Sequence, residues 1–166
     1  MPLEALLSIP ERLQDLPELL ARMEGFPSVL SALSQGRSAV VDGAWGSSAA
    51  LATAALSRQA PRTLLVVLAH PRDLDGWSGD LAGFAGFDAV VFPAWDDFRN
   101  DLGDVPCGVD EVGGQRLRLL KQLEGAHPPR LVLTTLQALM QPVPDRAHLA
   151  ATRRNLRITQ SADLEE

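Results

Sequence analysis

The stretch Ala39–Leu56, AVVDGAWGSSAALATAAL, contains the residue types of a phosphate-binding loop. An apolar run leads into a turn with Gly43 and Gly46, and an alanine-rich segment that favours a helix follows the turn. In such loops the glycines let backbone N–H groups approach phosphate oxygens. A lysine then neutralises the phosphates, and a hydroxyl binds magnesium. These residues could therefore form a nucleotide site.

The loop departs from the pattern G-x-x-x-x-G-K-[ST] where nucleotide chemistry needs it most. With Gly43 as the first glycine, Ser48 stands at the second glycine position, Ala49 at the lysine position and Ala50 at the magnesium-binding hydroxyl. A helix N-terminus here still attracts anions weakly. We predict no catalytic residues and no bound cofactor at this degenerate loop, which comprises Gly43, Gly46, Ser47, Ser48, Ala49 and Ala50. It is either the remnant of a nucleotide site or an ordinary Gly-Ser turn.

Other residues with chemical potential are scattered. The three histidines, His70, His127 and His148, lie far apart in the sequence, and none has metal-ligand spacing. We therefore predict no metal site. Trp45 and Trp95 are interpreted as packing residues, with the further hypothesis that Trp45 fills the space of a nucleotide.

Composition restricts the class of protein. The chain has 166 residues, 46% of them hydrophobic, and a net charge of −6, which disfavours binding of nucleic acid by this segment itself. Cys107 is the single cysteine, so no disulfide forms within one chain. No apolar run is long enough to cross a bilayer, and the N-terminus does not resemble a signal peptide. The expected location is the cytoplasm.

The elements that must position these residues alternate along the chain. Short continuous runs of Val, Leu and Ala predict four strands, which is the composition of strands buried on both faces of a parallel sheet. Helices are expected over 10–25, where Pro17 starts a new helix or kinks this one, and over 29–33. The predicted strands are 38–42, 63–69, 88–92 and 130–134, and the helices between them are 47–58, 74–84 and 110–123. This order predicts an α/β domain with a parallel sheet flanked by helices.

Two regions break the alternation. The connection 93–109 is long and acidic, and loops of that length are usually functional or disordered. Near the C-terminus, 155–160 has the pattern of a strand, and Asp163 with Glu166 has the spacing of a capping box. A helix start at the last residues indicates either truncation or a frayed polar tail.

Several segments together resemble a known family. They are the G-x-x-G-S turn, TLLVVLAHPRDLDGWSGDLAGF, VVFPAWDD, RLRLLKQL and LVLTTLQALMQPVP. This series resembles the N-terminal, UvrB-like region of the bacterial transcription-repair coupling factors. The most specific pieces are Phe92–Asp96 and Thr134–Pro144. The chain differs from the family over 98–114, so that loop receives no functional role.

The resemblance implies a P-loop-NTPase-like fold, similar to the first domain of UvrB, with a degenerate nucleotide loop. It also implies a non-catalytic scaffold within a larger ATP-dependent DNA translocase, where ATP and magnesium bind in a separate motor. Partners implied for the whole protein are UvrA, bound through the following domain, and RNA polymerase and DNA, bound through other modules. We expect a helical segment at 1–25, the UvrB-like domain at 26–152, and the start of the UvrA-binding domain at 153–166.

Two other functions fit the residues. One is a stand-alone P-loop-like nucleotide-binding enzyme with an unusual loop. The other is a small α/β domain that binds a metabolite or protein at the carboxyl ends of its strands, near Asp42, Ala69, His70 and Pro93.

Overall fold

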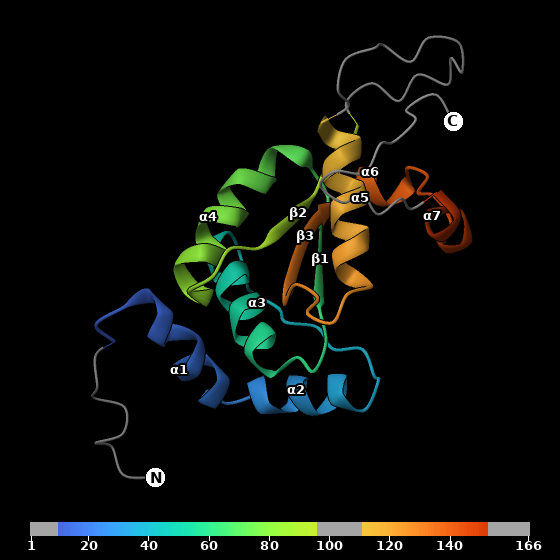
Figure 1. Ribbon diagram of the computed structural model, residues 1–166. Coiled ribbons are helices and arrows are strands. Elements are labelled where there is room, and N and C mark those ends of the chain that lie inside the picture. The colour runs from blue at the N-terminus through green and yellow to red at the C-terminus, as the bar shows by residue number, and fades with distance from the viewer. Residues whose placement is uncertain (1–9, 96–110, 153–166) are drawn as a thin grey trace.

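A computed structural model describes residues 10–95 and 111–152 of the chain (Figure 1). The predicted strand at 155–160, the capping box at its end, most of the acidic connection and Cys107 lie outside these residues. The domain boundary predicted at 153 falls there as well.

Three of the predicted strands form one parallel sheet. They are β1 (Leu64–Leu68), β2 (Val90–Phe92) and β3 (Leu131–Thr135), in the order β1-β3-β2. Leu64 to Leu68 pair in register with Leu131 to Thr135, and Val90 to Phe92 pair with Val132 to Thr134. The α/β class with a parallel sheet is confirmed, because β3 pairs in parallel with both β1 and β2.

Helices cover the sheet on both sides (Figure 1). On one side lie α3 (Ser47–Gln59) and α4 (Leu74–Ala85), and on the other lies α5 (Glu111–Leu123). All three were predicted, with ends that differ by one residue. The core on the α3 and α4 side contains Ala50, Leu68, Leu81, Ala89, Leu131 and Leu133, and the core on the α5 side contains Phe92, Leu119, Val132 and Ala138.

The N-terminal helices pack against α3. After a single turn at Leu13–Asp15 (η2), α1 spans Leu16–Arg22 and α2 spans Phe26–Ser34. Pro17 lies in the first turn of α1, so it starts a helix, as one of the two expectations had it.

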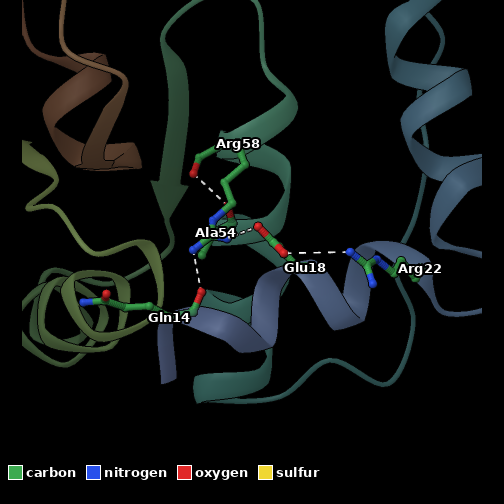
Figure 2. Close-up of polar contacts among 6 residues, drawn as sticks. Gln14, Glu18, Arg22, Ala54 and Arg58 are labelled. Carbon is green, nitrogen blue, oxygen red and sulfur yellow. Dashed lines mark hydrogen bonds and ion pairs between the residues drawn. The ribbon is translucent and has the colours of Figure 1, made fainter. Parts of the chain in front are cut away.

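One guanidinium joins α1 to α3. Arg58 donates to the carbonyl of Gln14 and lies 3.4 Å from the Glu18 carboxylate, which also approaches Arg22 (Figure 2). The Arg58 side chain is 26% exposed. Arg58 therefore connects α3 to η2 through Gln14 and to α1 through Glu18.

Three short elements were not predicted. The turn η3 (Pro71–Asp73) follows β1, α6 (Leu136–Met140) begins directly after β3, and α7 spans Arg146–Thr152. The Thr135 hydroxyl accepts the Ala138 N–H at 3.2 Å and caps α6, so the chain turns from strand to helix without a loop. Within the described residues, none of the helices is long and apolar enough to span a membrane.

The prediction of a strand at 38–42 is wrong. Residues 37–41 have no regular structure, and Val40 and Val41 are 86% and 43% exposed. An apolar run forms a strand only when a neighbouring strand accepts its hydrogen bonds, and β1 pairs only with β3 in the part of the chain that the structure describes.

The expectation that the strands are buried on both faces holds for β3 alone. Every residue of β3 is buried, whereas β1 alternates, with Leu65 50% and Val67 45% exposed. The buried face of β1 packs on the α3 and α4 side. On the other face α5 packs against β2 and β3, and β1 remains exposed.

Candidate functional site

The degenerate loop forms a tight turn on the surface, immediately before α3. Gly43 and Gly46 both have positive φ, 75° and 53°, a conformation that favours glycine. Ser47 is the first residue of α3, and Ser48 follows it; both are exposed. The glycine turn and the helix expected from the sequence are both present, although the strand that should precede them is missing.

The polar groups of this turn are used within the turn. The Gly43 N–H donates to the Asp42 carboxylate at 2.8 Å, and the Trp45 N–H donates to the Ser48 hydroxyl at 2.7 Å. The same hydroxyl donates back to the Trp45 carbonyl at 2.8 Å. Two N–H groups that could approach a phosphate are thus already occupied, and the Asp42 carboxylate would repel an anion.

Ala49 and Ala50 stand at the positions of the phosphate-binding lysine and the magnesium-binding hydroxyl. Ala50, in the first turn of α3, is fully buried in the core between this helix and the sheet, and Ala49 is half-buried. Neither offers a cation or a metal-binding oxygen. The site as it stands can neither neutralise a triphosphate nor hold magnesium by these side chains.

Trp45 projects from the turn, with 84% of its surface exposed. The interpretation of Trp45 as a packing residue is therefore wrong, whereas the hypothesis that it fills the space of a nucleotide stays a prediction. Likewise His70 and His127 are exposed. Among the residues that the structure describes, His, Cys, Asp and Glu side chains form no cluster that could hold a metal ion.

A second site, not predicted from the sequence, lies at the carboxyl ends of β2 and β3. Its centre is Arg116 of α5, which is only 2% exposed. With Val112 and Leu119, Arg116 follows the helical spacing that puts these residues on the sheet-facing side of α5. The helix thus places a guanidinium in the core on the α5 side.

The Arg116 guanidinium is hydrogen-bonded to oxygens of two chain segments. It donates to the Pro93 carbonyl at 2.7 Å, just after β2. It also donates to the carbonyl of Ala138 at 3.4 Å, the Gln141 side-chain oxygen at 3.4 Å and the Pro142 carbonyl at 3.3 Å, all after β3. Since a guanidinium carries its donors in a rigid plane, this arrangement fixes the two segments relative to each other.

Two aromatic rings flank the guanidinium. The Arg116 carbon Cζ lies 4.2 Å from the ring centroid of Phe92 and 4.2 Å from that of Trp95. Such contacts are favourable because the faces of aromatic rings carry partial negative charge. Hydrogen bonds and contacts with aromatic rings therefore both stabilise the buried cation.

Gln141 links the same segments directly. Its side-chain oxygen accepts the Trp95 N–H at 2.8 Å, and its side-chain nitrogen donates to the Trp95 carbonyl at 2.9 Å. The amide thus pairs with the Trp95 backbone as a neighbouring strand residue would. The Arg116 cluster, meaning Phe92, Pro93, Trp95, Arg116 and Gln141, consequently extends the β2–β3 contact beyond the ends of the strands.

A cavity of about 280 Å³ lies beside this cluster. Its walls are mainly apolar, since they comprise Trp95, Gly113, Gly114, Arg116, Leu117, Leu120, Val143 and Pro144. The four residues suggested as a metabolite site, Asp42, Ala69, His70 and Pro93, do not line it.

The sequence did offer a signal for Arg116. Arginine at a position of an apolar helical stripe is unusual, because a buried cation needs several partners. The partners themselves, three carbonyls and an amide more than twenty residues away, carry no sequence signal. Comparison of the chain with protein-family models, with curated proteins and with solved structures finds no match.

Proposed function

We propose that the chain is a non-catalytic, UvrB-like α/β module of a transcription-repair coupling factor. Its role is to act as a scaffold for the UvrA-binding domain in a protein that removes stalled RNA polymerase from damaged DNA. The proposal rests on the sequence resemblance. It implies that the P-loop-like turn is a relic of a nucleotide site.

The observation that best supports the proposal is the Arg116 cluster. Phe92–Trp95 belongs to the FPAWD segment, Gln141 belongs to TTLQALMQPVP, and Arg116 begins RLRLLKQL. Residues of three segments that carry the resemblance, each contact partner more than twenty positions from Arg116 in the sequence, thus meet at one buried guanidinium. Their shared role is to hold a shape, as a scaffold requires.

The state of the degenerate loop supports the non-catalytic part of the proposal. Ala49 and Ala50 replace the residues that bind phosphate and magnesium, and the loop's own Asp42 and Ser48 occupy the N–H groups of Gly43 and Trp45. Calorimetric titration with magnesium-ATP should therefore give no saturable heat up to about 1 mM, the upper end of common substrate affinities. A saturable signal that Gly43→Val abolishes would favour the nucleotide-binding enzyme instead.

The family assignment is tested by the native protein in its source cells. Peptides from this sequence, located on a denaturing gel by mass spectrometry, should migrate far above 17.9 kDa together with peptides of a helicase-type motor. Migration at 17.9 kDa would contradict the proposal, because the chain would then lack the domain that it is meant to support.

A further inference from the structure

In the part of the chain that the structure describes, the outer edge of β1 has no strand beside it. β1 stands at the end of the sheet order β1-β3-β2, so within the described residues one of its sides has no strand partner. All five of its residues are apolar, LLVVL, with no charge and no proline. Natural edge strands usually carry a charged residue, a proline or a bulge, because an edge without them can pair with strands of other chains.

The same strand also has an uncovered apolar face. Leu65 and Val67 point to one side of the sheet and are 50% and 45% exposed. Parallel sheets are normally covered on both faces, and here α5 covers only the part formed by β2 and β3. Edge and face together mark β1 as an interaction surface.

We propose that this edge pairs with β1 of a second copy of the chain, in an antiparallel arrangement about a two-fold axis through Val66. In this register Leu65 of each copy lies opposite Val67 of the other, on the same face. Both exposed residues of one copy thus meet both exposed residues of the partner. The strand is self-complementary, which is what a two-fold interface requires.

The charges that flank β1 agree with an antiparallel pairing. Exposed Arg62 precedes the strand, and Arg72, Asp73 and Asp75 follow it. Arg72 and Asp73 lie 3.8 Å apart as an ion pair, so one cation and two acids leave a net charge of −1 after the strand. An antiparallel arrangement brings the basic start of one strand near the acidic end of the other. A parallel arrangement of two copies would instead place like charges together.

Analytical ultracentrifugation of the full chain tests the proposal. The weight-average mass should rise with concentration from 17.9 kDa towards twice that value. Val67→Lys should raise the dissociation constant by at least about tenfold, since a lysine would replace an apolar cross-strand partner in both halves of the interface. Met23→Lys changes a residue of comparable exposure, 59%, just after the end of α1, and should leave the constant unchanged.

The register has its own test in a Cys107→Ser background. Val66→Cys should give a disulfide-linked dimer on mild oxidation, because residue 66 faces its own copy across the axis. Leu64→Cys should not, since Leu64 lies opposite Leu68 of the partner. Circular dichroism of each variant establishes that it is folded. If Val67→Lys is unfolded, Leu65→Gln takes its place.

The proposal is overturned if the wild-type chain remains at 17.9 kDa up to about 1 mM, where even weak association is populated. It is also overturned if the dimer survives the substitutions in β1, or if Leu64→Cys and Val66→Cys cross-link equally. Because these measurements use only the purified chain, their failure is distinguishable from failure of the scaffold proposal.

Discussion

Replacement of Arg116 should cost this protein a large part of its stability. Arg116→Ala removes a guanidinium that donates to Pro93, Ala138, Gln141 and Pro142 and that contacts two aromatic rings. Hydrogen bonds from charged groups contribute about 1.5–3 kcal/mol each, and each cation–π contact about 0.5–2 kcal/mol. Against them stands the cost of burying the cation, which is several kcal/mol.

We expect a net loss of about 3 kcal/mol, because truncation also leaves acceptors without donors and opens a cavity beside Leu119. Domains of this kind have a total stability of about 5–15 kcal/mol, so the loss is easily measured. Arg116→Lys should lose about 2 kcal/mol, since an ammonium keeps the charge but has neither the planar fork nor the stacking surface.

Urea unfolding, followed by circular dichroism and tryptophan fluorescence, gives these free energies. Arg118→Ala is the matched control, because Arg118 is exposed on the same helix and should change the stability by no more than about 0.5 kcal/mol. Arg116→Met tests the physical cause, since methionine fills similar space without donors. If Arg116→Met is as stable as wild type, hydrogen bonding does not hold the cluster together, and the reasoning is refuted.

Three further predictions concern other contacts of the structure. Gln141→Ala should lose about 1–2 kcal/mol in the same unfolding assay because it breaks both bonds to the Trp95 backbone, while exposed Gln137→Ala should have little effect; equal losses would contradict this role. Gly46→Ala should cost about 1 kcal/mol, since alanine is strained at a φ of 53°, and an unchanged urea midpoint would show that the turn relaxes freely. Arg58→Ala should speed amide hydrogen exchange in α1 without changing exchange in β3, because it removes a tie between α1 and α3; equal acceleration in both would mean global destabilisation instead.

Much of the fold was predictable because its elements have local signals. Apolar runs identified β1, β2 and β3, and helical periodicity identified α3, α4 and α5 to within a residue at either end. The presence of Pro17 in the first turn of α1 follows from the fixed backbone angle of proline. The short helices α6 and α7 were missed because five to seven residues give too few turns for a periodic pattern.

The strand predicted at 38–42 failed for a different reason. Its residues, SAVVD, have the composition of a buried strand, but strand formation depends on a partner that local composition does not specify. β1, whose five residues are all apolar, does form a strand, and β3 pairs with it along its whole length. Sequence therefore identified segments able to enter a sheet, and long-range pairing selected among them.

Only the part of the candidate site whose chemistry depends on the identity of particular side chains was predictable from the sequence. The missing lysine and hydroxyl of the degenerate loop are visible in the sequence, and the structure adds that Asp42 and Ser48 occupy its N–H groups. The Arg116 cluster could not be found this way, because its acceptors are mostly backbone carbonyls, which every residue has. Backbone carbonyls take up these positions only when the chain is folded. The contacts of Arg116 are therefore intact only when the fold around them is intact. For this reason the stability of Arg116 variants tests the packing on which the proposed scaffold depends, whereas nucleotide titration tests the proposal that the loop binds no nucleotide.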